Sequence, residues 1–369
     1  MRRMNPRARN SDGQPAAEPA TISDVARQAG VSIATVSRVL NQIPCRVNPQ
    51  ARKRALRAIR ELDYRPNALA RSLHRKRTST LGVLITDISN PYYAEITRGI
   101  EDVARQQGYA LFVCNTDRRP DIMVHYIDVL RENRVDAIII SGGGRPGRRH
   151  FQALHQRRIP TVLIGRYDVP LPAVRVDNFK GGWEAATHLL RLGHRRIAIL
   201  SGPATSTSIQ DRMKGYRRAL AEQKVPLPSH WVLRGDLRPA SALRLAERLI
   251  NGYQRPTAIL AANDQMAIAA IRAALKRGLR VPEDLSVVGF DNIELASYVN
   301  PALTTMGLPL YRMGVAAAEI AIRLPARDSP ADEAWFTPEL IIRESTAAPT
   351  TADQRTPPRP RRDLTRGDA

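Results

Sequence analysis

Seven short runs rich in β-branched and other apolar residues recur between residues 81 and 289, and helical stretches separate them. Strands that alternate with helices are typical of parallel sheets, because each crossover helix packs on a face of the sheet. The alternation therefore predicts an α/β fold for most of the chain. The runs are 81–85, 110–114, 137–141, 161–165, 197–200, 258–261 and 286–289.

A capped helical segment, TISDVARQAGVSIATVSRVLN at 21–41, precedes this region. Thr21 suits a helix N-cap, and Asp24 lies three residues later, where a carboxylate favours the helix N-terminus. A first helix is therefore expected over 22–29. Gly30 is suited to the left-handed conformation that ends such a helix.

A second helix is expected over 33–40, capped by Ser32, so that the pair forms a helix-turn-helix. Its small core would contain Val25, Val36, Val39 and Leu40. The residues left facing solvent would be Ile33, Ala34, Ser37, Arg38 and Asn41. A face of small and hydroxyl side chains with one arginine fits a DNA major groove, although an ordinary surface hairpin has the same pattern.

A third amphipathic segment begins at Asn48 and Pro49, which suit an N-cap and the first helical position. Apolar residues recur there at helical spacing: Ala55, Leu56, Ile59 and Leu62. The other face is basic: Arg52, Lys53, Arg54, Arg57 and Arg60. Residues 1–78 contain seventeen Lys and Arg against five Asp and Glu, a net of +12 out of +22 for the chain. This concentration is typical of phosphate neutralisation and favours double-stranded DNA as a partner.

Longer motifs follow in a fixed order: ELDYRPNALARSL, LGVLITDISNPYYAEITRGIE, LLRLGHRRIAIL, DRMKGYRRAL, AANDQMAIAA and LSVVGFDNIELASYVNPALTTM. Through these motifs and the helix-turn-helix, the chain resembles the lac repressor family of bacterial transcription regulators over residues 21–346. Within that family it is similar to ribose-responsive members. The resemblance implies a repressor whose operator affinity is controlled by a small-molecule effector, with a sugar favoured.

The implied architecture is a small all-α helix-turn-helix headpiece followed by a two-lobed, periplasmic-binding-protein-like α/β effector domain. The returns of the chain between the lobes would lie at 304–309 and 335–337. Both termini are rich in Pro and charged residues and are expected to be disordered. The expected boundaries are 1–20 (basic tail), 21–66 (headpiece), 67–78 (hinge helix and linker), 79–346 (effector binding and dimerisation) and 347–369 (tail). Lobe one would comprise about 79–177 and 308–334, and lobe two about 178–304 and 337–346.

The resemblance also implies DNA contacts. In the second helix, Ile33 and Ala34 would read bases, Arg38 would contact a base edge, and Thr35, Ser37 and Asn41 would help hold phosphates. The hinge would add Asn67, Ala70, Arg71 and Leu73, with Leu73 wedged into a central base step. From its residues alone, NALARSL at 67–73 is too short for a stable isolated helix, so a plain linker remains the alternative.

Five residues are implied to line the effector cleft: Tyr92, Tyr93, Arg212, Asn263 and Asp291. Each has a structural alternative, because an arginine on a helix often forms a surface ion pair, Asn263 or Asp291 could cap a helix, and one tyrosine could be core. The sequence departs from many relatives at Gly165 and at Leu237, which offers less stacking surface than an aromatic ring. These departures favour a small polar ligand such as a pentose over a purine or a hexose.

Two other classes share such a fold. A solute-binding protein would need an export signal, but residues 1–20 contain no apolar stretch of that kind. A sugar or nucleotide enzyme could use the glycines at 142–144, yet their spacing matches no phosphate motif, and neither catalytic nor metal-binding motifs are recognised. The sequence therefore predicts no cofactor, no enzyme activity and no membrane association. It predicts a cytoplasmic, nucleoid-associated bacterial homodimer on a pseudo-palindromic operator.

Overall fold

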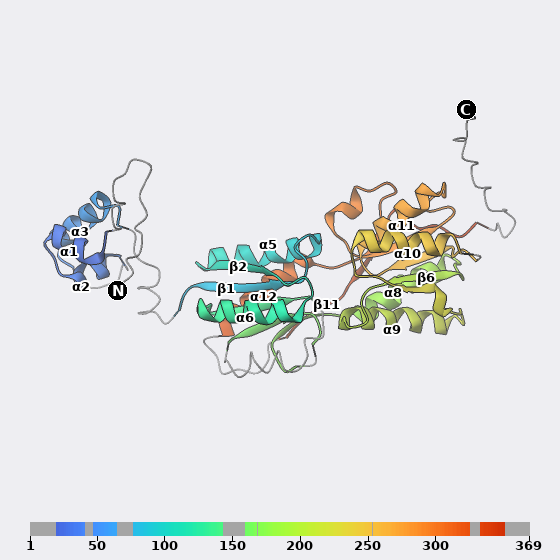
Figure 1. Ribbon diagram of the computed structural model, residues 1–369, viewed down its shortest axis with the longest axis horizontal. Coiled ribbons are helices and arrows are strands. Elements are labelled where there is room, and N and C mark those ends of the chain that lie inside the picture. The colour runs from blue at the N-terminus through green and yellow to red at the C-terminus, as the bar shows by residue number, and fades with distance from the viewer. Residues whose placement is uncertain are drawn as a thin grey trace, which may run out of the picture. The chain divides into compact units, whose positions relative to one another are not determined.

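The computed structural model describes residues 20–40, 47–64, 77–142, 159–167, 169–252, 254–324 and 333–350. The chain divides into two compact units between Thr78 and Ser79 (Figure 1). The described part of the first unit is helical, and the second unit contains two six-stranded sheets. This confirms the predicted combination of a small all-α unit with a two-lobed α/β domain.

The first unit contains the predicted helical pair, α1 (Ile22–Ala29) and α2 (Ile33–Leu40), followed by α3 (Pro49–Glu61). Thr21 and Asp24 form a reciprocal capping box, in which the Thr21 amide donates to the Asp24 carboxylate at 3.0 Å. Gly30 ends α1 at φ +60° and ψ +43°, so the prediction of a left-handed turn is confirmed. The two caps stabilise α1 although it has only eight residues, and at the start of α2 the Thr35 amide donates to Ser32 Oγ at 3.1 Å.

The core of the first unit is small and built mainly from alanine and valine. On α3 the inward stripe has the spacing i, i+3, i+4 and i+7, which leaves the neighbouring Leu56 41% exposed. The prediction that Leu56 belongs to the packed face is therefore wrong, whereas the basic residues of α3 are exposed as expected. The core comprises Val25, Ala26, Ala29, Val36, Val39, Ala55 and Ala58, with Leu40, Ile59 and Leu62 partly buried against it.

Lobe one of the second unit contains a fully parallel sheet with the strand order β11-β5-β4-β3-β1-β2. One face packs on helices α5 (Pro91–Gln106) and α12 (Leu310–Arg323), and α6 (Pro120–Glu132) covers the other. The strands are β1 (Thr80–Ile85), β2 (Ala110–Asn115), β3 (Ala137–Ser141), β4 (Thr161–Ile164), β5 (Ala173–Val176) and β11 (Glu333–Phe336).

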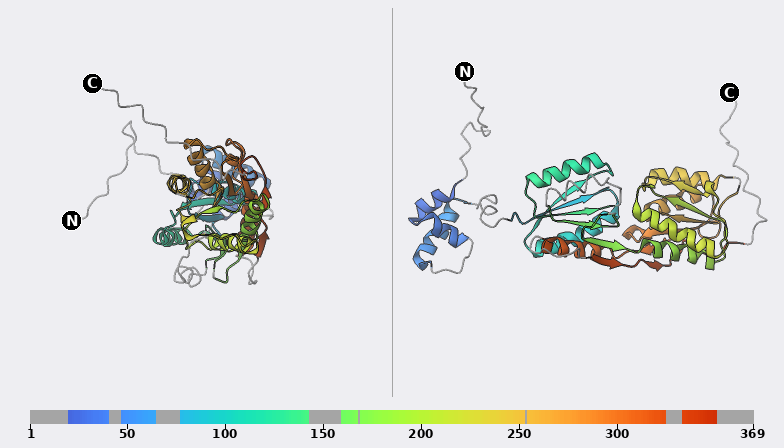
Figure 2. Two further views of the ribbon diagram at one scale, coloured as in Figure 1. Left: turned by 90° about the vertical axis from the view of Figure 1, so that its right-hand side faces the viewer. Right: turned by 90° about the horizontal axis from the view of Figure 1, so that it is seen from below.

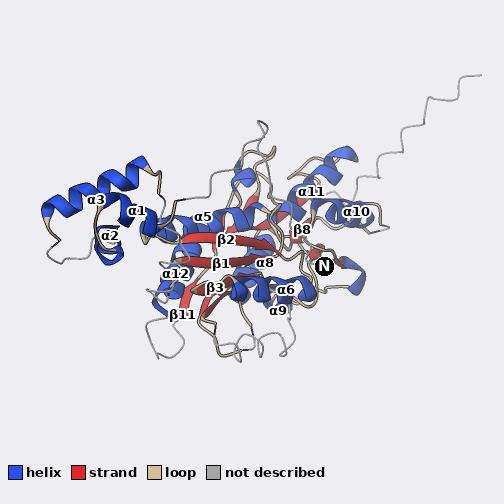
Figure 3. Ribbon diagram, turned by 60° about the vertical axis from the view of Figure 1, so that its left-hand side comes forward, coloured by secondary structure: helices blue, strands red, loops and turns tan. Residues whose placement is uncertain are grey.

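Lobe two repeats this layering with the order β12-β10-β9-β8-β6-β7, in which only β12 is antiparallel to its neighbour. Figure 3 shows the strands of the second unit in red and the helices around them in blue. Helices α8 (Asn178–Arg191) and α9 (Thr207–Glu222) pack on one face, and α10 (Pro239–Ile250) and α11 (Asp264–Lys276) pack on the other. The strands are β6 (Ile197–Ser201), β7 (Val232–Arg234), β8 (Ala258–Ala261), β9 (Ser286–Asp291), β10 (Thr304–Gly307) and β12 (Glu339–Ile341).

The chain passes between the lobes three times: after β5, after β10 and between β11 and β12. The C-terminal segments, red in Figure 2, run along one side of both lobes. All seven predicted runs are strands, and β10 and β11 overlap the predicted returns at 304–309 and 335–337, but β5, β7 and β12 were not predicted. These three strands are short, and each contains a charged residue, so none forms an uninterrupted apolar run. None of the helices in the described ranges has the length and apolar character required to span a membrane.

Candidate functional site

The two sheets of the second unit direct the carboxyl ends of several strands toward a common cleft between the lobes. Ligands in open parallel sheets bind at such ends, because the loops there leave polar groups unpaired by the ladder. The cleft encloses about 670 Å³, part of it open to solvent. The polar residues that line it are Asn90, Tyr92, Tyr93, Arg118, Asn178, Ser206, Ser208, Arg212, Asn263 and Asp291.

Arg212 is buried in the wall of lobe two, and three elements converge on its guanidinium. Its Nε donates to Asn178 Oδ1 at 2.8 Å, and its Nη1 donates to the carbonyl oxygen of Ala262. Its Nη2 lies 3.4 Å from Asp291 Oδ1, and its Cζ stacks 3.4 Å from the centroid of the Phe290 ring. A buried cation is tolerated only with such partners. The position of Arg212 therefore agrees with the predicted cleft residue and not with the alternative of an arginine in a surface ion pair.

The position of Arg212 depends on a close approach of two helices. A Cβ atom on Gly182 of α8 would lie 2.3 Å from the carbonyl oxygen of Arg212 on α9. Only glycine leaves room for the two backbones at that separation. The α8–α9 contact therefore holds the guanidinium at a fixed depth in the cleft wall.

Asp291 ends β9 with φ +114°, a conformation that side chains other than glycine rarely adopt. Behind it lies Asp264, whose carboxylate accepts from the Ile293 amide at 2.8 Å and from Thr305 Oγ1. Burial raises the pKa of both carboxyls, the charge of Asp291 raises that of Asp264 further, and Arg212 opposes the shift at Asp291. The two carboxyls therefore interact, and the pair retains a proton well above the pH at which an ordinary carboxyl group loses it.

Asn263 serves two structural purposes at the cleft wall. Its Oδ1 caps α11 by accepting from the Met266 amide at 2.9 Å, and its Nδ2 donates to the Leu237 carbonyl oxygen at 3.2 Å. The helix-cap alternative considered for Asn263 is thus realised, while the residue also lines the cleft. Gly165 and Leu237, the two departures from many relatives, line the same cleft.

Tyr92 and Tyr93 begin α5 and form the lobe-one wall, with their rings edge to face at 4.9 Å. Thr86 Oγ1 donates to Tyr93 Oη at 2.5 Å, and the Tyr93 ring joins the core of lobe one. Burial raises the pKa of both phenols, so both remain neutral hydrogen-bonding groups. Tyr93 is therefore both a core and a cleft residue, whereas Tyr92 is less deeply buried.

All five residues predicted for the cleft come together there, but the sequence reasoning missed several others. Asn90 and Ser206 are N-caps of α5 and α9, and Arg118 lies in the β2–α6 loop. The sequence contains a pattern that indicates such residues, because polar residues between a strand and the following helix lie at the edge of a parallel sheet where ligands bind. Asn178 follows the unpredicted strand β5, which explains why it was missed.

The first unit presents the predicted face of α2 to solvent. Ile33 is 50% exposed, Ala34 and Arg38 are exposed, and Thr35 and Ser37 are half-buried. Thr35 Oγ1 lies 2.9 Å from Ser32 Oγ, which orients its hydroxyl at the start of the helix. Asn41 and the four hinge residues Asn67, Ala70, Arg71 and Leu73 lie outside the described residues.

Both units match protein families that are already known. Residues 21–67 match the model of bacterial regulatory proteins of the lacI family, and residues 78–334 match periplasmic binding proteins and the sugar binding domain of the LacI family. The chain belongs to the lacI family. Its members are transcriptional regulators, which agrees with the helix-turn-helix and the cleft found in this chain.

Individual members of the lacI family are similar over nearly their whole length. Catabolite control protein A of Priestia megaterium is 38% identical, covering 88% of this chain and 99% of that protein. The HTH-type transcriptional repressor PurR of Aliivibrio fischeri is also 38% identical, with coverages of 88% and 98%. The crystal structure of the lac repressor dimer bound to operator and the anti-inducer ONPF has a TM-score of 0.82 and 30% identity, and covers 90% of this chain and 100% of that one.

The raised pKa values of Asp264 and Asp291 predict how the free energy of unfolding depends on pH. A carboxyl whose pKa is raised by folding stabilises the protein below its unfolded pKa, and that contribution is lost as pH rises through the folded pKa. Asp264→Asn removes one of the two groups, so the free energy of unfolding of the variant should fall less steeply between pH 4.5 and 7. We expect a difference in slope of up to about 1.4 kcal/mol per pH unit. Urea unfolding across that range measures it, and equal slopes would show that Asp264 is ionised in the folded protein.

Proposed function

We propose that the chain is a repressor that binds operator DNA through α2 and loses or gains operator affinity when a small neutral sugar occupies the cleft. The observation that carries this proposal is the convergence of hydrogen-bonding side chains from both lobes on one cleft. A ligand held by both lobes favours one lobe arrangement over the other, and such differential binding is what shifts a two-state equilibrium. The match of residues 78–334 to a sugar binding domain supports the ligand class.

The charges of the cleft favour a neutral ligand. Arg212 already neutralises Asp291, and Arg118 lies 4.0 Å from Asp87. An anionic sugar acid or sugar phosphate would find the charges of both arginines already balanced by carboxylates. Hydroxyl groups can both donate and accept, so they suit a wall of phenols, amides and serines. Leu237 in place of an aromatic ring favours a ligand no larger than a pentose.

The DNA contacts are assigned to the exposed face of α2. We assign base reading to Ile33, Ala34 and Arg38, and phosphate contacts to Thr35, Ser37 and Asn41. The exposed basic residues of α3 add phosphate attraction without sequence preference. The hinge roles of Asn67, Ala70, Arg71 and Leu73 remain predictions from the resemblance.

A homodimer is the proposed working form, as in the lac repressor structure. Strand β2 forms one edge of the lobe-one sheet and exposes Phe112 and Val113. An exposed apolar edge strand invites pairing unless another surface covers it. Two headpieces in one dimer would read the two halves of a pseudo-palindromic operator. We also propose that this regulator is cytoplasmic and is not an enzyme. Two relatives that support this are named as a catabolite control protein and a transcriptional repressor.

Arg38→Ala tests the assignment of base reading. Loss of one bidentate contact should weaken binding to the selected operator by about 1 to 3 kcal/mol and relax base preference at one position. Binding of the variant to a library of single-base operator variants measures both effects. Arg52→Ala is the matched control, because an exposed phosphate-contacting arginine should weaken binding uniformly. Uniform weakening by Arg38→Ala as well would make Arg38 a phosphate contact.

Arg212→Gln tests the effector site. Operator affinity without effector should be kept, whereas the response to any sugar that acts on the wild-type chain should be lost. A thermal-shift screen of pentoses, hexoses, sugar acids and nucleobases identifies that ligand, and operator binding is then titrated with it. Lys276→Gln, which removes a surface ion pair with Glu247, is the control. A normal sugar response in Arg212→Gln would remove Arg212 from the site, and the absence of any sugar ligand would refute the sugar proposal.

A further inference from the structure

Two equivalent loops face each other across the cleft, one from each lobe. In lobe one, TDRRP at residues 116–120 joins β2 to α6, and in lobe two GDLRP at 235–239 joins β7 to α10. Each loop follows the last strand at one edge of its sheet, and each ends in a proline at the first position of a helix. The repeated layering of the two lobes thus brings two copies of an Asp-x-Arg-Pro sequence together.

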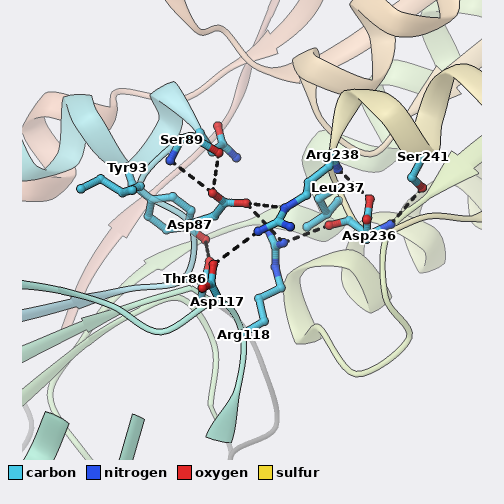
Figure 4. A network of polar contacts seen from close by, with 12 residues as sticks. Thr86, Asp87, Ser89, Tyr93, Asp117, Arg118, Asp236, Leu237, Arg238 and Ser241 are labelled. Atoms are coloured by element: carbon cyan, nitrogen blue, oxygen red, sulfur yellow. Dashed lines mark hydrogen bonds and ion pairs between the residues drawn. The ribbon is translucent and has the colours of Figure 1, made fainter. Parts of the chain in front are cut away.

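The two loops are joined by a set of polar contacts that we call the clasp: Asp87, Asp117, Arg118, Asp236 and Arg238. Arg238 Nε donates to Asp87 Oδ2 at 2.9 Å, and its Nη2 donates to Asp117 Oδ1 at 3.4 Å. In the opposite direction, Arg118 Nη1 donates to the carbonyl oxygen of Asp236 at 2.9 Å. Figure 4 shows these contacts passing from one lobe to the other.

Asp87 is the anchor of the clasp, because its side chain is only 6% exposed. Ser89 donates to Asp87 Oδ1 from its hydroxyl at 2.6 Å and from its amide at 3.2 Å. Burial acts to raise the pKa of Asp87, but hydrogen bonds from Ser89 and Arg238 outweigh it and hold the pKa below its usual value. A carboxylate that is buried and still ionised depends on its cation, so breaking the contact with Arg238 has a cost.

Both loops contain backbone conformations that are unfavourable for residues other than glycine. Asp117 and Arg118 have φ angles of +48° and +57°, and Leu237 has +68°. Such strain persists only where surrounding contacts compensate it, and it is concentrated at functional positions. In this chain the left-handed residues bring Arg118 and Leu237 to the cleft wall, where both line the ligand space.

A second inter-lobe contact lies beyond the other wall of the cleft. Arg166 follows β4 in lobe one, and its Nε lies 2.7 Å from Asp211 Oδ2 on α9 of lobe two. Thr207 Oγ1 also donates to the carbonyl oxygen of Arg166. The cleft is therefore flanked by inter-lobe contacts on two sides.

On the basis of the proposed effector site, we propose that the clasp controls the opening of the lobes and thereby the effector concentration at which the regulator responds. The clasp favours the closed arrangement before any ligand binds, so a ligand that binds this arrangement needs less of its binding free energy to close the lobes and exchanges more slowly. Arg238 is the residue that determines its strength, because from lobe two it contacts both carboxylates of lobe one, Asp87 and Asp117. Ionic strength modulates the clasp, since half of the Arg238 side chain is exposed to solvent.

The test measures lobe opening directly in the full-length, ligand-free protein. Spin labels on Glu132→Cys at the end of α6 and Gln223→Cys at the end of α9 report the distance between the lobes, in a background with Cys45→Ser and Cys114→Ala. Labelled chains are diluted with unlabelled chains so that only distances within one chain are observed. Both label positions are exposed and lie at the helix ends away from the cleft.

Arg238→Gln should lower the ratio of closed to open lobes by about two- to five-fold, as expected for a partly exposed ion pair. High salt should shift the wild-type distance distribution in the same direction. Arg280→Gln is the matched control, because it removes a half-exposed arginine that pairs with Asp284 within lobe two. A distance distribution that Arg238→Gln leaves unchanged, or that Arg280→Gln shifts equally, would overturn the proposal.

Asp87→Asn provides an independent check through a double-mutant cycle. If Asp87 and Arg238 act as a pair, the double variant should open the lobes no further than the stronger single variant. Multiplicative effects of the two substitutions would contradict the pairing. Neither measurement uses an effector, so failure of the sugar screen would refute the proposed ligand and leave the clasp intact, and an inert clasp would leave the sugar site intact.

Discussion

The buried guanidinium of Arg212 is the interaction on which the cleft depends. It connects α9 to α8 through Asn178, to the end of β8 through the Ala262 carbonyl, and to the end of β9 through Asp291. A buried charge requires such compensation, so the three elements are held in register with one another. The absence of a Cβ on Gly182 is what allows α9 to approach α8 closely enough for these contacts. The ligand wall of lobe two is thus a single polar network rather than a set of separate side chains.

Lobe one meets this wall with a different kind of surface, made of the tyrosines that begin α5 and of the β2–α6 loop. Polar contacts between the lobes lie at the edges of the cleft, at the clasp and at the Arg166–Asp211 pair. Of the clasp residues, Arg118 also lines the ligand space. Most of the inner polar groups are thus available to a ligand, while the charges at the edges influence the lobe equilibrium. Coupling between a cleft ligand and DNA then needs only a differential binding free energy of roughly 1 to 3 kcal/mol between two lobe arrangements.

The sequence predicted the elements whose pattern is local. The cap at Thr21, the turn at Gly30 and the seven apolar runs of the α/β unit depend on neighbouring residues, and all are found in the structure. It failed where the outcome depends on tertiary context. Leu56 lies one step off the packed stripe of α3, and β7 is a three-residue strand that gains its stability from β6. The partners of Arg212 and Arg238 come from distant segments, so no spacing in the sequence indicated them.

In the proposed mechanism, cleft occupancy and operator binding are linked in one protein. Such linkage is reciprocal: an effector that changes operator affinity by a given factor must itself bind more tightly or more weakly by that factor when operator is present. Calorimetric titration of the identified sugar into the free protein and into the operator complex measures one factor, and operator titration with and without sugar measures the other. If the two sites are linked, the two factors are equal and differ from one. A sugar that binds the cleft with the same affinity in both states would contradict it.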